Sequence, residues 1–188
     1  GLQARAEVHL RAGRPRAARG QGPEFVTRLV NSLGQTTAYH WQLQGQDYRL
    51  LEARGPGCAT CGEVNRRFAY TAEGRLRRED WLGTDGRSYR ALIRDYDGQG
   101  RLSGLRRLAE GRPERSEIFR HDDPAHPDRL TAWERPSVWP GHRAVTEYRY
   151  GPDGRLERVV ESGYTPAGEV LHRERTVAAI SSAAGLDA

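Results

Sequence analysis

Two cysteines, Cys58 and Cys61, have the clearest potential for chemistry because they form a CxxC pair. They follow a Gly-Pro-Gly run at residues 55–57, which predicts a turn. A lone CxxC pair is compatible with a local disulfide, with two free thiols or with half of a zinc site. Zinc would need two more ligands, and there is no second CxxC. A disulfide between Cys58 and Cys61 is therefore favoured, and we expect no metal.

Segment 121–128 is the second candidate, because it concentrates possible metal or proton ligands. These are His121, Asp122, Asp123, His126 and Asp128. The segment lacks the glycine spacing of an EF-hand loop. Its two prolines, Pro124 and Pro127, predict a stiff turn that explains the composition without a ligand. We therefore expect a structural turn.

Catalytic patterns are absent from the rest of the sequence. Asp95 and Asp97 lie at an expected hairpin turn, where aspartate side chains accept hydrogen bonds from the backbone. There is no nucleophile elbow, phosphate loop or pair of catalytic carboxylates. We expect a chain that is not an enzyme and binds no cofactor.

Strand patterns and regularly spaced glycines dominate the chain. Thr37, Tyr39, Trp41 and Leu43 alternate with more polar neighbours, which is the period of a strand. Glycines recur at intervals typical of a strand and its turn, which leaves no room for long helices. Two longer intervals, residues 45–74 and 111–141, each contain an extra turn and suggest two related larger units. The predicted fold is an all-β antiparallel meander.

One short pattern recurs three times: an aromatic residue, three turn-forming or polar residues, and then Gly-Arg-Leu. The copies contain Tyr70, Gly74, Arg75 and Leu76; Tyr96, Asp97, Gly100, Arg101 and Leu102; and Tyr150, Gly154, Arg155 and Leu156. A degenerate fourth copy spans residues 164–170. Each copy predicts a strand end, a turn whose glycine has a positive φ, and the next strand. Packing of the aromatic residue across the hairpin onto the leucine would contribute roughly 0.2–1 kcal/mol per pair.

This pattern resembles the YD repeat of the Rhs family, which includes bacterial Rhs proteins, insecticidal-complex shell proteins and the animal teneurins. Only Tyr96 is followed by Asp, so the other copies depart from the dipeptide that names the repeat. The resemblance implies hairpins wound into a curved or spiralling sheet, which closes into a hollow shell in long members. A chain of 188 residues would supply a piece of such a wall.

Composition supports a polar sheet. Only 36% of the residues are hydrophobic and the mean hydropathy is −0.82, which is too little for a thick two-layer core. All 30 basic residues are Arg, and the net charge is +5. Acids are interleaved with them, so we expect cross-strand ion pairs rather than a nucleic-acid surface. No apolar run is long enough for a membrane span or a signal sequence.

We expect three regions: an N-terminal strand with an Arg-, Gly- and Pro-rich connection (1–25), the hairpin array (26–176) and a frayed tail (177–188). The absence of Met suggests a processed chain or a piece of a longer one. By resemblance, the expected function is a structural wall or scaffold of a secreted or cell-surface protein, which encloses a cargo or belongs to a cell-surface assembly. Its expected partners are other repeats of the parent chain or further copies, joined by strand addition near Val8 or Val170. The alternative is a carbohydrate-binding module whose Arg and aromatic side chains take an anionic glycan.

Overall fold

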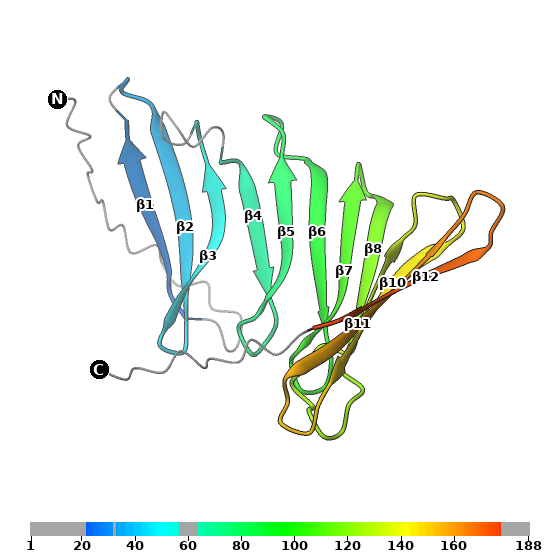
Figure 1. Ribbon diagram of the computed structural model, residues 1–188. Coiled ribbons are helices and arrows are strands. Elements are labelled where there is room, and N and C mark those ends of the chain that lie inside the picture. The colour runs from blue at the N-terminus through cyan, green and yellow to red at the C-terminus, as the bar shows by residue number, and fades with distance from the viewer. Residues whose placement is uncertain (1–21, 32, 57–63, 178–188) are drawn as a thin grey trace, which may run out of the picture. The chain divides into compact units, whose positions relative to one another are not determined.

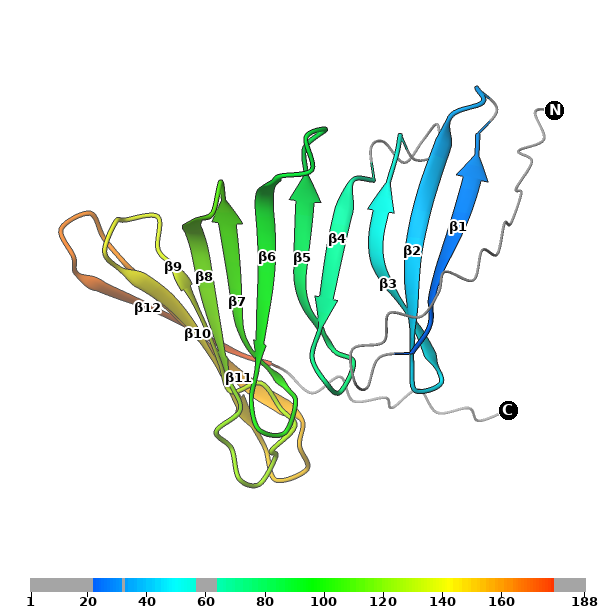
Figure 2. The same ribbon diagram turned by 180° about the vertical axis from the view of Figure 1, so that it is seen from behind.

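A computed structural model describes residues 22–31, 33–56 and 64–177, which form one antiparallel sheet of twelve strands. Each strand lies beside its neighbours in sequence (Figures 1 and 2). The strands are β1 (Glu24–Val30), β2 (Thr36–Gln44), β3 (Asp47–Arg54), β4 (Arg66–Tyr70), β5 (Leu76–Leu82), β6 (Ser88–Tyr96), β7 (Leu102–Ala109), β8 (Arg112–Arg120), β9 (Ala132–Pro136), β10 (Arg143–Tyr150), β11 (Leu156–Tyr164) and β12 (Val170–Thr176). None of the described ranges is helical. The predicted all-β meander is confirmed.

The strands belong to two compact units. The first holds the residues up to Arg94 together with Arg107–Glu114, and the second holds Asp95–Arg106 and the residues from Arg115 onward. The strand predicted near Val8, the pair Cys58 and Cys61, and the tail beyond Val177 lie outside the described residues. In the part that is described, no helix is long and apolar enough to cross a membrane.

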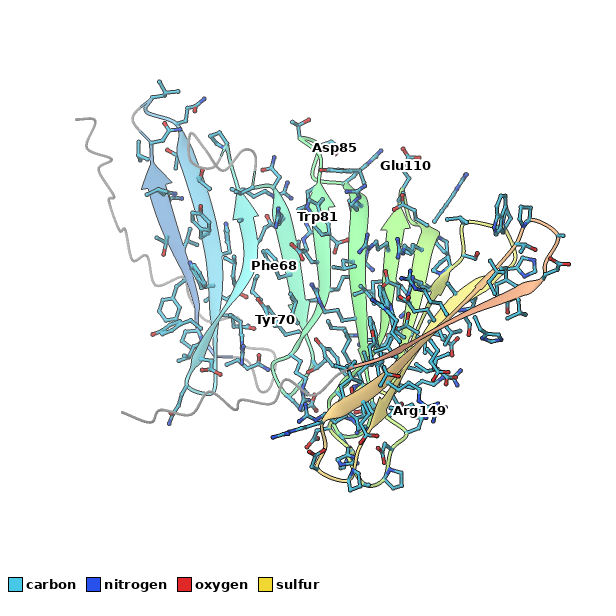
Figure 3. All side chains as sticks on the ribbon, viewed as in Figure 1. Phe68, Tyr70, Trp81, Asp85, Glu110 and Arg149 are labelled. Carbon is cyan, nitrogen blue, oxygen red and sulfur yellow. The ribbon has the colours of Figure 1, made fainter. Side chains whose placement is uncertain are left out.

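Glycines with positive φ close the hairpins, as the spacing predicted. Gly74, Gly86, Gly100, Gly154 and Gly168 have φ values between 73° and 84°. Side chains other than glycine are strained in this region, so the turn conformation fixes the residue type. Among the described residues, the one exception is Glu110, with φ 49°, in the two-residue connection between β7 and β8 (Figure 3).

In the two halves of the chain, β1–β6 and β7–β12, three neighbouring strand pairs have the same register 80 residues apart: β2–β3 and β8–β9, β3–β4 and β9–β10, and β4–β5 and β10–β11. The last pairs differ, because Arg78 lies opposite Ile93 in β5–β6 whereas Arg158 lies opposite Thr176 in β11–β12. Glu52 pairs with Arg67 in the first half, and Ala132 pairs with Glu147 in the second. The hairpins β4–β5 and β10–β11 also correspond, because each has a bulge directly before its last tyrosine. The sequence prediction of two related units was right in kind but matched the wrong segments, since it paired residue 45 with residue 111.

Small and charged side chains fill the most protected positions. The buried apolar residues in the described part are Ala53, Leu82, Ala91 and Ala132. Glu79, Asp80 and Glu117 are buried as well. Charged groups are buried in proteins only when they are paired. Ion pairs within a strand, as for Asp80 and Glu117, and between strands, as for Glu79, therefore take over part of the role that a hydrophobic core has in a two-layer domain.

Asp80 illustrates how a buried carboxylate is compensated in the first unit. Burial alone would raise the pKa of Asp80, but hydrogen bonds from Arg78 and Ser88 lower it below its usual range. Arg78 donates at 2.8 Å and the Ser88 hydroxyl at 2.7 Å. On the adjacent position, Glu79 accepts from Arg66 at 3.0 Å.

Glu117 has the corresponding arrangement in the second unit. Its carboxylate accepts a hydrogen bond from Trp133 Nε1 at 2.9 Å and pairs with Arg115 at 3.0 Å. The guanidinium of Arg135 lies 4.3 Å from the centre of the Trp133 ring. A half-buried indole is thus held between a carboxylate and a cation, both from neighbouring positions of the sheet.

Candidate functional site

One five-residue turn is found six times in the part of the chain that the structure describes, and it is the repeated structural element there. In each copy the first residue donates its N–H to the carbonyl of the fifth, and the glycine in fourth place donates to the carbonyl of the first. The copies are residues 31–35, 71–75, 83–87, 97–101, 151–155 and 165–169. The motif tyrosines Tyr70, Tyr96 and Tyr150 end one strand, and Leu76, Leu102 and Leu156 begin the next. The motif therefore marks a defined hairpin.

A side-chain oxygen supports the N–H of the fifth turn residue in these turns. Asp97 Oδ1 accepts from Arg101 N at 2.9 Å, and Thr71 Oγ1 accepts from Arg75 N at 3.2 Å. Asp97 also pairs through Oδ2 with Arg101 Nε at 2.7 Å. Burial would raise the pKa of Asp97, but these bonds from Arg101, with one from Gln99 N, lower it.

Glycine occupies the first turn position in two copies, and there another residue supplies the oxygen. Gly83 and Gly151 have no side chain, and the third turn residue takes over. Asp85 Oδ1 accepts from Arg87 N at 2.9 Å (Figure 3), and Asp153 Oδ1 accepts from Arg155 N at 3.0 Å. The copies that depart from Tyr-Asp thus keep the same support of the turn.

The motif tyrosines Tyr70 and Tyr150 link neighbouring strands through their hydroxyl groups. Tyr70 donates to the carbonyl of Leu50 at 2.9 Å, and Tyr150 donates to the carbonyl of Leu130 at 2.8 Å. Burial raises the pKa of both tyrosines. We call this contact the tyrosine link. Tyr70 is paired with Leu76 across its hairpin, and Tyr150 with Leu156.

Flat cationic or aromatic groups cover the ring and the turn glycine of these hairpins. The Arg49 guanidinium lies 5.7 Å from the centre of the Tyr70 ring. It also lies over Gly74, where an added Cβ would be 2.6 Å from its Nη2. Gly74 is therefore required by its positive φ, and the arginine side chain packs closely over it.

His126 takes the corresponding place in the second unit. Its ring lies 6.2 Å from that of Tyr150, and an added Cβ on Gly154 would be 3.2 Å from its Cδ2. Arg129 lies 5.9 Å from the Tyr150 ring centre. Nδ1 of His126 is 3.0 Å from Asp123 Oδ2, and this hydrogen bond lowers the pKa of Asp123.

A groove lies beside the tyrosine link in each unit. In the first unit it has a volume of about 360 Å³, and in the second about 480 Å³. His40, Glu52 and Phe68 line the first, and Arg120, Ala132 and Tyr148 occupy the corresponding places in the second. Asp122, Asp123 and Pro124 widen the lining of the second groove. The repeat therefore places an open groove with a mixed polar and apolar lining in each unit.

Segment 121–131 is a turn between β8 and β9, as the prolines predicted. Asp123 Oδ1 accepts from Ala125 N at 2.9 Å, and Thr131 Oγ1 accepts from Asp122 N at 3.0 Å. In the described ranges, no three His, Cys, Asp or Glu side chains are grouped so that they could hold a metal. The expected disulfide cannot be placed, since Cys58 and Cys61 lie outside those ranges.

Sequence reasoning did not find Arg49 or His142, and it named His126 only as a possible metal or proton ligand. The His142 ring stacks on Tyr164 at 4.5 Å and lies over Gly168, as His126 does over Gly154. These residues come from an adjacent strand or loop, so local spacing around the motif does not contain them. One sequence signal could have found the arginines beside these tyrosines. An Arg-Leu dipeptide occurs at residues 49–50 and 129–130, and in each case its leucine lies 20 residues before the tyrosine that bonds to it.

These features define a class, an antiparallel sheet built from repeated hairpins with a common turn. No protein-family model matches the chain, and no curated protein matches it. Among solved structures, it is similar to part of TcdB2-TccC3, with a TM-score of 0.50 and 16% identity. The match covers 80% of this chain but 9% of that one. At this identity the likeness concerns the fold alone and carries no information on activity.

A porin-like protein from Bacteroides uniformis ATCC 8492 also matches, with a TM-score of 0.36 and 11% identity. That match covers 88% of this chain and 93% of the other. At this TM-score the likeness carries no argument.

Proposed function

We propose that the chain is a non-enzymatic structural segment of an exported Rhs-like protein, forming part of a β-sheet wall or scaffold. The supporting observation is the sheet itself, in which one hairpin design is repeated and each strand is hydrogen-bonded to its sequence neighbours. Such an array gains stability by adding neighbours rather than by closing around a core. Secretion or display on a cell surface belongs to the same proposal, and its support is the YD-repeat resemblance.

The last strand supports the role of a wall segment, because its outer edge is open in the described part of the chain. All seven residues of β12 are exposed. Val177 N donates to Glu157 O at 2.8 Å, so the amides of Arg173 and Arg175 point toward β11 as well. The amides of Glu174 and its alternate neighbours therefore point outward. Such an edge accepts a further strand.

Hydrogen exchange tests whether this edge is open in dilute, monomeric protein. We expect the amides of His172, Glu174 and Thr176 to exchange rapidly, while those of Arg173 and Arg175 are protected. A matched pair of prolines gives a second readout. Glu174→Pro should cost little more than Glu174→Ala, whereas Arg175→Pro removes a ladder bond and should cost more than Arg175→Ala. Equal protection of both sets of amides would overturn the wall proposal.

Carbohydrate binding is the second candidate, and the groove of about 480 Å³ in the second unit favours it. The Tyr148 ring and the carboxylates of Asp122 and Glu147 could contact sugar hydroxyls. The groove's three carboxylates outnumber its two guanidinium groups, so a neutral sugar fits better than an anionic one. Calorimetry with neutral and sulfated oligosaccharides tests this, with Tyr148→Ala as the variant and Tyr89→Ala, exposed in the other unit, as its control.

Arginine side chains already cover several aromatic rings. This weakens the expectation from the sequence that Arg and aromatic side chains together bind an anionic glycan. Arg66 lies 5.3 Å from the centre of the Trp81 ring on the neighbouring strand (Figure 3). Tyr70 and Trp133 are covered by Arg49 and Arg135 in the same way. A glycan would have to displace these cations before it could stack on the rings.

A further inference from the structure

We infer that the strand which adds to β12 is β1 of a second copy, so that the chain assembles head to tail. This inference rests on the proposed function and names its partner. It draws on three features of the described residues: the repeat of six strands, the direction of the free amides and the charges along the two edges.

The internal repeat specifies the kind of strand that should follow β12. β12 ends the second group of six strands as β6 ends the first, and β6 is followed in the sheet by β7. β1 begins the first group as β7 begins the second. A junction between β12 and β1 would therefore repeat the order that the chain already uses between β6 and β7.

The free amides of β1 are in the right places for this pairing. Asn31 N donates to Gln35 O at 2.9 Å and Leu43 N donates to Pro23 O at 3.1 Å, so the odd-numbered residues of β1 face β2. The amides of Val26, Arg28 and Val30 consequently point away from β2. β1 and β12 are both seven residues long. Each of the two strands thus has four outward amides at the same spacing, those of the even-numbered residues.

Charge selects one register among those that match these amides. With Arg28 opposite Glu174, Val26 lies opposite Thr176 and Val30 opposite His172. Arg28 is exposed and has no ion-pair partner among the residues that the structure describes. A shift of two residues in either direction would place Arg28 opposite His172 or Thr176 and lose the pairing of opposite charges.

The geometry of such an assembly follows from its interface. β1 and β12 are different surfaces, so the contact is heterologous and each added copy leaves one β1 edge and one β12 edge open. Unless the rotation between copies closes a ring, the product is an open filament rather than a dimer.

Charge reversal tests the partner in solution. Sedimentation at increasing concentration should show a mass that rises beyond that of a dimer. Arg28→Glu should lower the association constant, up to about fivefold for the lost pair and further for the new repulsion. Adding Glu174→Arg should restore it. Because Glu174 also pairs with Arg158 at 3.2 Å within the chain, Glu174→Ala is the control for that loss.

Disulfide trapping tests the register independently. In a Cys58→Ser, Cys61→Ser background, Thr27→Cys with Arg175→Cys places two thiols on directly opposed residues of the inferred register. Oxidation should give a ladder of dimers, trimers and larger species on non-reducing gels. Thr27→Cys with Leu171→Cys, displaced by four residues, should give none.

The outcomes separate this inference from the wall proposal. A cross-linked ladder together with charge rescue supports the head-to-tail partner. A mass that stops at a dimer, or equal cross-linking of the displaced pair, overturns it. A monomer whose outward β12 amides exchange rapidly also overturns it, but leaves the wall proposal standing. A monomer in which those amides are protected overturns both.

Discussion

Segments 40–52 and 120–132 have the same length and join corresponding pairs of residues, but they fold differently. His40 pairs with Glu52 at the base of the first, and Arg120 pairs with Ala132 at the base of the second. Residues 41–51 continue the ladder to a two-residue turn at Gly45. Residues 121–131 leave the sheet and return only at β9. The register of the flanking strands therefore fixes the positions of the two ends of each segment, but it does not determine the backbone path between them.

Residue type explains the difference in path. Trp41 to Gln44 alternate between apolar and polar side chains and can all donate to a ladder. Pro124 and Pro127 have no N–H, so a central pair of strands cannot form through them. The tyrosine link is nevertheless present in both halves. Its acceptor Leu50 lies within β3, whereas Leu130 lies outside β9, next to Thr131, whose backbone bonds to Arg120 and Tyr148.

Exchanging the two segments should have the largest effect. Replacing residues 41–51 with the sequence of 121–131 removes four ladder pairs, from Trp41↔Leu50 to Gln44↔Asp47. At about 1 kcal/mol for each hydrogen bond, we expect a loss of roughly 4 kcal/mol in the free energy of unfolding by urea. Replacing residues 121–131 with the sequence of 41–51 introduces a segment that forms its own two-residue turn, so the loss of unfolding free energy should be much smaller. Equal costs would mean that the path is dictated by the surrounding sheet.

Removing the tyrosine link should have the next largest effect. Tyr70→Phe and Tyr150→Phe each leave a carbonyl without its donor, at a cost of roughly 1–3 kcal/mol in unfolding free energy. We expect the larger cost at Tyr150, because its acceptor Leu130 lies in the turn outside β9, whereas Leu50 lies within β3. Tyr148→Phe on the same strand is the control and should be nearly neutral. A neutral Tyr150→Phe would show that the link is dispensable.

Removing the aspartate that supports a turn should have a smaller effect on stability, and this effect should differ between copies of the turn. Asp97 accepts two backbone hydrogen bonds and pairs with Arg101, while Asp153 accepts one backbone hydrogen bond and lies 3.3 Å from Arg155. Thermal unfolding should therefore show a larger loss for Asp97→Ala than for Asp153→Ala. Asp97→Asn, which keeps an accepting oxygen, should recover part of the loss. The opposite order would contradict this account of the turn.

The smallest expected effect is on the pKa of Asp123, the partner of His126. His126 lies over Gly154 in the second unit, as Arg49 lies over Gly74 in the first. The hydrogen bond from His126 lowers the pKa of Asp123. A lowered folded pKa means that this contact stabilises the folded state above the usual aspartate range, about pH 3.9, and is lost as the pH falls through the folded pKa. Carbon-detected NMR titration should show the Asp123 midpoint rising in His126→Ala. An unchanged midpoint would show that the contact is absent in solution.

The local part of the fold could be predicted from sequence. Glycine at Gly74, Gly100 and Gly154 marks the turns because its positive φ excludes other residues, and that signal lies within a few residues. The motif also placed the ends of β4 and β10 and the starts of β5 and β11 correctly.

The surroundings of the motif could not be predicted in the same way. Arg49 reaches its hairpin from an adjacent strand, and His126 reaches its hairpin from an adjacent loop. The two residues differ in type, although each packs beside the tyrosine ring of its hairpin. The repeat at 80 residues was hidden because segments 40–52 and 120–132 share length and register but not sequence. Both features depend on which residues lie opposite each other in neighbouring strands, and a pattern along the sequence does not contain that information.

The scarcity of buried apolar side chains has a thermodynamic consequence. The heat capacity of unfolding rises with the apolar surface that becomes exposed and falls with the polar surface. In the described residues the buried positions hold one leucine, three alanines and polar side chains, among them the ion-paired acids Glu79, Asp80 and Glu117. Unfolding should therefore change the heat capacity by less than the 12–15 cal/mol/K per residue, approximately, that is typical of globular domains. The stability of this sheet should vary only gently with temperature, with a broad maximum instead of a narrow dome.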